Sequence, residues 1–183
     1  ILAADDPSMF SSQNEQDSRN YAAFARVPML EPADSAEAHE FVQRAFEISE
    51  DFDTPVMIRE SMRIAHTKSL VEVGDARAND GLRDFTPDAS KYVMMPVYAR
   101  GRRQVVIERT RKLVEFAESS DLNRIEMRDT SIGIIASGAV YQHVREALPQ
   151  ASTFKLGLSW PLPPAKLKEF ADAVEHLYVV EEA

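Results

Sequence analysis

The chain opens with ILAADDPSMFSSQNEQDSRNYAAFARVPMLEP (residues 1–32), in which two short apolar runs flank a long polar segment. The apolar runs, 1–4 and 27–32, are typical of buried strands. Between them, Ser12 and Glu15 have the spacing of a capping box, so we predict a helix that begins near Gln13. We expect the buried face of this helix to consist of Tyr21, Phe24 and Ala25. The segment therefore predicts the order strand, helix, strand.

The next residues repeat this order. Asp34 and Glu37 form a second capping box. Behind it, apolar residues recur at helical spacing: Ala38, Phe41, Val42, Ala45 and Phe46. The run TPVMIRE (54–60) is a third strand candidate. Alternating strands and helices with short connections predict a parallel sheet.

The middle of the chain has a different character. Residues 66–101 mix Gly, Asp, Pro and charged residues without a sustained period, which is typical of a connection between domains. Residues 102–119 predict a charged helix with one apolar stripe, which consists of Val106, Thr110, Leu113, Val114 and Ala117.

A second β-α-β-α-β pattern follows, with strands predicted at 131–138, 152–160 and 176–180. The first of its helices is lined by Val140, Tyr141, Val144, Ala147 and Leu148, and the second begins at a proline and is lined by Leu167, Phe170, Ala171 and Val174. We therefore predict an α/β fold of two small β-α-β-α-β units with mainly parallel sheets. The predicted parts are 1–70, a linker with one charged helix at 71–129, and 130–183.

The small size of each predicted unit has a consequence. Helices would cover only part of each sheet, so apolar faces and strand edges would stay exposed. The sequence begins at Ile1 within a strand-like run and ends at Ala183 just after another. We interpret it as a piece of a longer protein and expect it to self-associate.

Composition excludes several classes of function. The formal charge is −9 and the pI is about 5.0, which argues against binding nucleic acid or an anionic membrane. The 183 residues include no cysteine, so this chain holds no disulfide, thiolate nucleophile or cysteine-ligated cluster. No apolar run approaches the roughly 20 residues of a membrane span.

The main candidate site is the polar segment after the first strand. In open parallel sheets, ligands bind beyond the carboxyl ends of the strands, and this segment follows such an end. One interpretation is that Ser12 and Glu15 cap a helix while the rest is solvated. The other is that the segment also lines an active-site channel, the candidate lining residues being Asp6, Ser11, Ser12, Gln13, Asn14, Glu15 and Asp17.

Two smaller clusters offer alternatives. The adjacent carboxylates of Asp5 and Asp6 suit either a metal or acid–base role, or a turn closed by the following proline. Arg59, Arg63 and His66 come after the third predicted strand, where they could bind an anion or form salt bridges between domains.

The remaining signals are weaker. The strand, turn and helix around Ser137 and Gly138 mimic the start of a dinucleotide-binding unit, but they lack G-x-G-x-x-G. His39, His143 and His176 are far apart and lie on or beside amphipathic helices, so we expect them at the surface and predict no metal site.

A resemblance to a known family runs through most of the chain. The block ADDPSMFSSQNEQDSRNYAAFARVPMLEP (4–32) is similar to the alpha subunits of indolepyruvate:ferredoxin oxidoreductases, which are thiamine diphosphate-dependent 2-oxoacid:ferredoxin oxidoreductases. The similarity continues in order through RESMRIAH, ASKYVMMP, IGIIASGAVYQHVREAL, FKLGLSWPLPPAKL and LYVVEEA. This sequence has Phe10 where relatives often have His.

The resemblance implies a role for each part. Residues 1–70 would be the later part of a pyrimidine-binding domain, and residues 130–183 the start of a transketolase C-terminal-like domain. The complete cytoplasmic enzyme would decarboxylate an aryl pyruvate on thiamine diphosphate with Mg²⁺. It would pass electrons through 4Fe–4S clusters to ferredoxin and form an aryl-acetyl-CoA, with a beta subunit and the rest of the alpha subunit as partners.

The same resemblance places the catalytic Glu outside this sequence, so no residue here is assigned a catalytic role. We expect the isolated chain to be inactive and to bind none of these cofactors. Two alternatives stay open. The chain could be a non-catalytic assembly module, or it could belong to another 2-oxoacid oxidoreductase or a transketolase-like enzyme.

Overall fold

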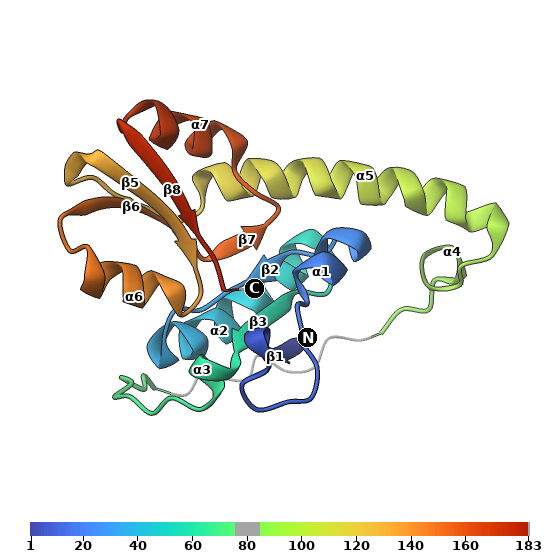
Figure 1. Cartoon of the computed structure of the whole chain (residues 1–183). Helices are drawn as coiled ribbons and strands as arrows, with labels where there is room; N and C mark the ends of the chain where they lie inside the picture. Colours follow the sequence, from blue (N-terminus) through green and yellow to red (C-terminus); the bar gives the residue numbers. More distant parts are fainter. Residues whose placement is uncertain (76–84, 183) are drawn as a thin grey trace.

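The computed structural model describes residues 1–75 and 85–182. It contains two four-stranded sheets, of order β1-β3-β2-β7 and β4-β6-β5-β8 (Figure 1). The strands are β1 (Leu2–Asp5), β2 (Met29–Leu30), β3 (Met57–Ser61), β4 (Asn123–Glu126), β5 (Asp129–Ser137), β6 (Ala151–Leu156), β7 (Leu158–Trp160) and β8 (His176–Val180). We call the first sheet with its helices the first unit, and the second sheet with its helices the second unit.

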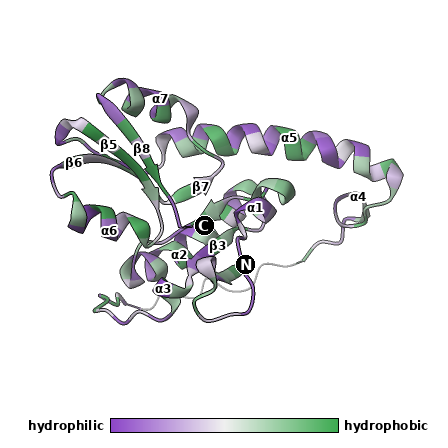
Figure 2. Cartoon of the chain, viewed as in Figure 1, coloured by the Kyte–Doolittle hydropathy of each residue, from purple (hydrophilic) through white to green (hydrophobic). Residues whose placement is uncertain are grey.

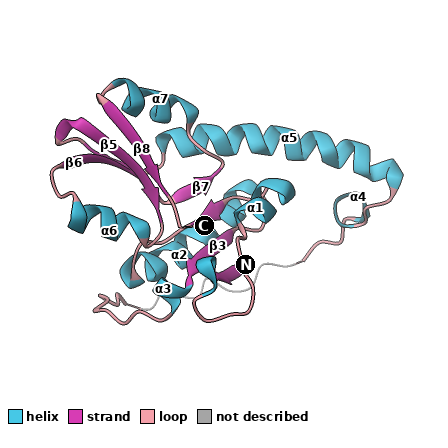
Figure 3. Cartoon of the chain, viewed as in Figure 1, coloured by secondary structure: helices cyan, strands magenta, loops and turns pink. Residues whose placement is uncertain are grey.

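The helices cover these sheets and connect them (Figure 3). They are α1 (Arg19–Ala25), α2 (Ser35–Phe52), α3 (Met62–Ala65), α4 (Ala89–Tyr92), α5 (Pro96–Ser119), α6 (Val140–Ala147) and α7 (Pro164–Asp172), and a short 3-10 helix spans Pro7–Met9. The second sheet lies between α6 and α7, and α5 projects from the body of the molecule as a long arm that bears α4 at its far end (Figure 1).

The predicted α/β class with mainly parallel sheets is confirmed. Strand β3 pairs in parallel with β1 and β2, and β5 pairs in parallel with β6 and β8. Each sheet also has one antiparallel edge strand, β7 beside β2 and β4 beside β6. Each unit therefore has four strands instead of the expected three.

The predicted strand 152–160 is divided between the two sheets at Gly157. At this point the backbone runs tightly against residue 122: the Gly157 N–H donates to the Leu122 carbonyl at 3.1 Å, and a Cβ added to Gly157 would collide with that same oxygen. Only a glycine fits this approach. The chain therefore passes from β6 in the second sheet to β7 in the first.

Helix α2 confirms its predicted start. The Asp34 carboxylate accepts the N–H of Glu37 at 2.9 Å, as expected for an N-cap. Phe41 and Ile48 are buried against the first sheet, whereas Val42 and Phe46 are exposed. The buried face of α1 is Ala22 rather than the predicted Tyr21, Phe24 and Ala25, which are exposed.

The core of the first unit is formed by residues that are distant from one another in the sequence. Leu30 and Ile58 of the first sheet pack with Leu113 and Ala117 near the end of α5 and with Leu158 of β7. Hydrophilic residues recur along much of the length of α5 (Figure 2), and its described buried residues lie in its last two turns. The predicted connection 66–101 includes 76–84, which lie outside the described residues.

Apolar side chains remain exposed at the edges of both sheets. Leu2 on β1 and Tyr178 and Val179 on β8 are more than half exposed. This agrees with the expected exposed edges, and self-association stays a prediction. Among the described residues, no helix combines the length and apolar character that a membrane crossing requires.

Candidate functional site

The polar segment after β1 is a loop held by the Asp6 carboxylate. Asp6 accepts the backbone N–H groups of Phe10 at 3.0 Å, Ser11 at 2.6 Å and Ser12 at 2.5 Å. Burial raises the pKa of Asp6, but the hydrogen bonds from Ser11 and Ser12 outweigh it, so this pKa lies below its ordinary value. The carboxylate is therefore charged at neutral pH.

This arrangement shows that the predicted capping box at Ser12 and Glu15 is wrong. The Ser12 hydroxyl donates to the Asn14 carbonyl at 2.6 Å, and helix α1 begins only at Arg19. Asp6 accepts the Ser12 N–H, which the Glu15 side chain would accept in a capping box, and the segment stays a loop. We call residues 10–18 the polar loop.

Asp5 holds the other end of this loop. Its carboxylate accepts both the N–H and the hydroxyl of Ser18 at 2.6 Å. It also accepts the Arg59 Nε–H at 2.6 Å. The two adjacent carboxylates thus fix the start and the end of the polar loop by hydrogen bonds.

Arg59 lies inside β3, not after it as predicted, and its side chain is only 4% exposed. Besides Asp5, it binds Glu31 through Nη1 at 3.0 Å, and its Nη2 lies 3.8 Å from the Asp17 Oδ1. Three carboxylates from three segments therefore surround one buried guanidinium.

Glu31 joins this cluster to the second unit. It follows β2 directly, and its Oε2 accepts the hydroxyl of Ser137 at the end of β5, at 3.2 Å. Gly138 makes the turn there with a φ of +57°, a conformation that favours glycine. The interpretation of the sequence missed Glu31, although its place at the carboxyl end of a parallel strand was a usable signal.

A small cavity of about 10 Å³ lies within the cluster and is lined by Glu31, Arg59, Ser61 and Ser137. The Glu31 Oε1, Arg59 Nη2 and Ser61 Oγ are buried and have no hydrogen-bond partner among the described residues. A cavity of this size holds about one water molecule, and three polar atoms are enough to bind one.

Arg63 and His66 lie apart from Arg59, on or just after α3. The Arg63 Nε–H donates to the Glu182 carboxylate at 2.6 Å, and its guanidinium stacks 4.6 Å from the centroid of the Phe10 ring. His66 and His143 line a hollow of about 540 Å³ between α3 and α6. Across the described residues, no group of three His, Asp or Glu side chains is arranged to hold a metal ion.

The polar loop exposes most of its predicted lining residues. Ser11, Gln13, Asn14 and Glu15 are exposed, while Asp17 is partly buried. Arg19 donates to Asp17 through Nε and Nη2, both at 2.8 Å, which lowers the pKa of Asp17 against the opposing effect of burial.

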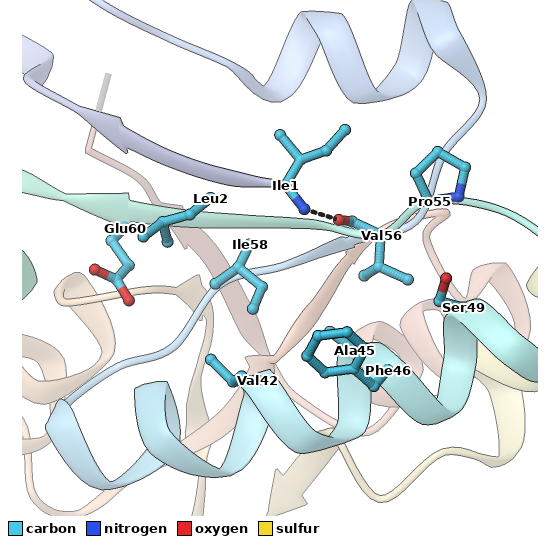
Figure 4. A pocket seen from close by; sticks show the side chains of 10 residues that line it. All are labelled: Ile1, Leu2, Val42, Ala45, Phe46, Ser49, Pro55, Val56, Ile58 and Glu60. Atoms are coloured by element: carbon cyan, nitrogen blue, oxygen red, sulfur yellow. Dashed lines mark hydrogen bonds between the residues drawn. The ribbon is translucent and has the colours of Figure 1, made fainter. Parts of the chain in front are cut away.

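A separate hollow of about 390 Å³ lies between α2 and strands β1 and β3 (Figure 4). Its lining is mostly apolar and includes Ile1, Val42 and Phe46, with Glu60 at one end. Burial raises the pKa of Glu60. We call this hollow the apolar groove.

Comparison with known proteins points to one kind of subunit. No family model matches the chain. Over its whole length, however, the chain is 41% identical to the indolepyruvate oxidoreductase subunit IorA of Methanothermobacter marburgensis. The same subunit from Thermococcus kodakarensis is 39% identical and that from Archaeoglobus fulgidus 33% identical, again over the whole chain.

This sequence corresponds to part of an indolepyruvate oxidoreductase alpha subunit. The resemblance stated above is thereby confirmed. The chain spans 30% of the length of these curated relatives.

A solved structure agrees with the fold. The chain superposes with a TM-score of 0.66 on the 2-oxoglutarate:ferredoxin oxidoreductase of Magnetococcus marinus, which was determined with 2-oxoglutarate, coenzyme A and succinyl-CoA bound. The match covers 98% of this chain and 40% of that one, at 13% sequence identity. At this identity the likeness establishes the fold alone.

Proposed function

We propose that the chain is part of an oxidoreductase that oxidatively decarboxylates aryl pyruvates, such as indolepyruvate, to aryl-acetyl-CoA with ferredoxin as the electron acceptor. The observation that carries this proposal is the match to IorA subunits along the whole chain, at up to 41% identity. The fold shared with a 2-oxoacid:ferredoxin oxidoreductase supports it.

Within this enzyme, we assign the polar loop to the wall of the substrate channel. It lies at the carboxyl edge of the first sheet, where ligands of parallel α/β folds bind. Its Gln13 and Asn14 are exposed, and their amide groups can donate hydrogen bonds to the carboxylate of a 2-oxoacid. Asp5 and Asp6 have structural roles, because their oxygens are used to hold the loop.

The cofactors of this reaction would be held by other parts of the enzyme. The chain has no cysteine to ligate a 4Fe–4S cluster, and its described residues form no three-ligand group for the Mg²⁺ of thiamine diphosphate. The residues present therefore do not fit these groups. Partners in the proposal are the rest of the alpha subunit, the beta subunit, ferredoxin and coenzyme A.

Two observations favour the alternative of an assembly module. The apolar groove and the exposed apolar residues of β8 offer surfaces for subunit contact. Both roles are compatible within one chain, since the polar loop and the apolar groove are built from different residues.

The test uses the complete enzyme with Gln13→Ala and Asn14→Ala in the polar loop, and Gln104→Ala on the exposed face of α5 as the matched control. We expect the KM for indolepyruvate to rise about tenfold in the loop variants, since each loses a hydrogen bond to a charged group. Unchanged KM values in both loop variants would contradict the channel-lining role. Reduction of ferredoxin with pyruvate or 2-oxoglutarate but not with indolepyruvate would contradict the substrate assignment.

A further inference from the structure

We propose that the acidic pair Glu181–Glu182, which follows β8 in the second unit, positions the polar loop of the first unit by holding both of its ends. The structural part of this inference stands on contacts within the chain, and its effect on catalysis rests on the proposed function of the loop. Glu181 and Glu182 act through arginines, so we assign them a positioning role.

Glu181 holds the end of the loop. Its Oε2 lies 3.2 Å from the Arg19 Nη1, and Arg19 in turn binds Asp17 at 2.8 Å. Asp17 in turn forms an ion pair with Arg59, with 3.8 Å between the Asp17 Oδ1 and the Arg59 Nη2. The charges alternate along this chain of contacts, so each side chain stabilises the next.

Glu182 holds the start of the loop. Its carboxylate accepts the Arg63 Nε–H at 2.6 Å, and the Arg63 guanidinium lies 4.6 Å from the Phe10 ring centroid in a cation–π contact. The Glu182 side chain is 14% exposed and Arg63 is 42% exposed. Two consecutive acidic residues of the second unit therefore reach the two ends of one loop in the first unit.

The contacts form a closed ring across the junction of the units. Beyond Asp17 they continue through Arg59 and Glu31 to Ser137, with 3.0 Å between Arg59 and Glu31 and 3.2 Å between Glu31 and Ser137. Ser137 ends β5 and Glu181 follows β8, and these strands pair in parallel up to the partners Ala136 and Val180. Backbone pairing within the second sheet thus closes the ring.

The side chains at the centre of the ring are more deeply buried than those at its rim. The side chains of Arg59 and Glu31 are 4% and 2% exposed, so breaking their contact would leave a buried charge unpaired. Arg19 and Glu181 at the rim are 23% and 55% exposed, where an ion pair is weaker and sensitive to salt. A displacement of the second sheet would therefore first release the polar loop, while the central pair stays intact.

The test compares two double variants of the complete enzyme that remove the same charge from the second unit. Glu181→Gln with Glu182→Gln breaks the two contacts, and Glu169→Gln with Glu175→Gln is the control. Hydrogen–deuterium exchange of peptides covering residues 10–18 is the first readout, and the KM for the 2-oxoacid is the second. We expect about fivefold faster exchange in the loop for the first variant, and no change for the control.

Exchanging the charges of Arg63 and Glu182 tests whether the contact between them can be restored. Arg63→Glu alone should speed exchange at the start of the loop, and Arg63→Glu combined with Glu182→Arg should slow it again. Unchanged loop exchange in the first double variant, or equal acceleration in β3 and β5, would overturn the positioning role. Faster loop exchange with an unchanged KM would uphold the positioning role and contradict the proposed channel-lining function of the loop.

Discussion

Replacing Lys155 by Met tests the buried ion pair that joins the two units. Lys155 on β6 is 1% exposed; its Nζ donates to the Glu37 Oε2 of α2 at 2.5 Å and lies 4.8 Å from the Phe41 ring centroid. Removal of one partner of a buried pair costs about 3–5 kcal/mol when the other charge is left alone. Glu37 retains Arg124 at 2.7 Å and the Ala33 N–H at 2.8 Å, so we expect a smaller loss, about 2 kcal/mol.

The measurement is thermal and urea-induced unfolding, in a double-mutant cycle with Glu37→Gln. A loss of about 2 kcal/mol lowers the Tm of a chain of this length by about 4–8 °C. We expect the double variant to be more stable than the sum of the single losses by about 1 kcal/mol or more. Lys168→Met, which breaks the exposed pair with Asp172, is the control and should change stability little. Strict additivity of Lys155→Met and Glu37→Gln would refute the reasoning.

Three further outcomes are expected. Gly157→Ala should destabilise the chain by about 2–4 kcal/mol, because the added Cβ would collide with the Leu122 carbonyl. The measurement is the Tm, which should fall; a Tm equal to that of the parent chain would contradict this. Burial lowers the pKa of Lys155 below its ordinary value of 10.5, an effect that Glu37 partly opposes. Between the lowered pKa and 10.5 the unfolded chain binds more protons than the folded chain, so the free energy of unfolding should rise with pH in this window. Lys155→Met should abolish this rise. Asp6→Asn should speed amide exchange at Phe10, Ser11 and Ser12, because one of the two acceptor oxygens becomes an NH2 donor and the other loses its negative charge. Equal exchange rates would show that the loop is held by other contacts.

The elements that could be predicted are those with local signals. Helix α2 has its cap at Asp34, and α7 begins at Pro164, as the sequence indicated. The buried stripe near the end of α5, with Leu113 and Ala117, also follows from spacing. In each case, residues within one or two turns determine the outcome, so a local pattern is sufficient.

The errors come from contacts that the helical or strand pattern of a segment does not show. Ser12 and Glu15 have the spacing of a capping box, but the Asp6 carboxylate takes the Ser12 N–H, and the helix starts later. The break at Gly157 depends on residue 122, which is distant in sequence. Asp6 is near Ser12 in the sequence, but the capping-box spacing does not include it, and residue 122 cannot be identified from the segment around Gly157.

The candidate site shows the same division. Position at the carboxyl edge of a sheet drew attention to the polar loop, since strand order alone places it there. Arg59 was predicted at the same edge but lies inside β3. The pairing of Arg59 with Asp5 and Glu31 depends on three strands coming together, whereas the sequence left open whether Arg59 binds an anion or forms salt bridges between domains. Burial of this guanidinium among carboxylates of its own chain is a tertiary property.

The structure has two kinds of contact between distant parts of the chain, and they have different consequences. Leu158 of β7 and Leu113 of α5 belong to the same core as Leu30 and Ile58, so apolar burial holds the first sheet together with later parts of the chain. That attraction is not directional and does not fix the position of a loop at the sheet edge. The hydrogen bonds of Arg59, Glu31 and Ser137 are directional, and they lie where the carboxyl ends of both sheets meet. Stability of the core of the first unit and geometry of the polar loop should therefore respond to different substitutions, the first to Leu113→Ala and the second to Glu181→Gln.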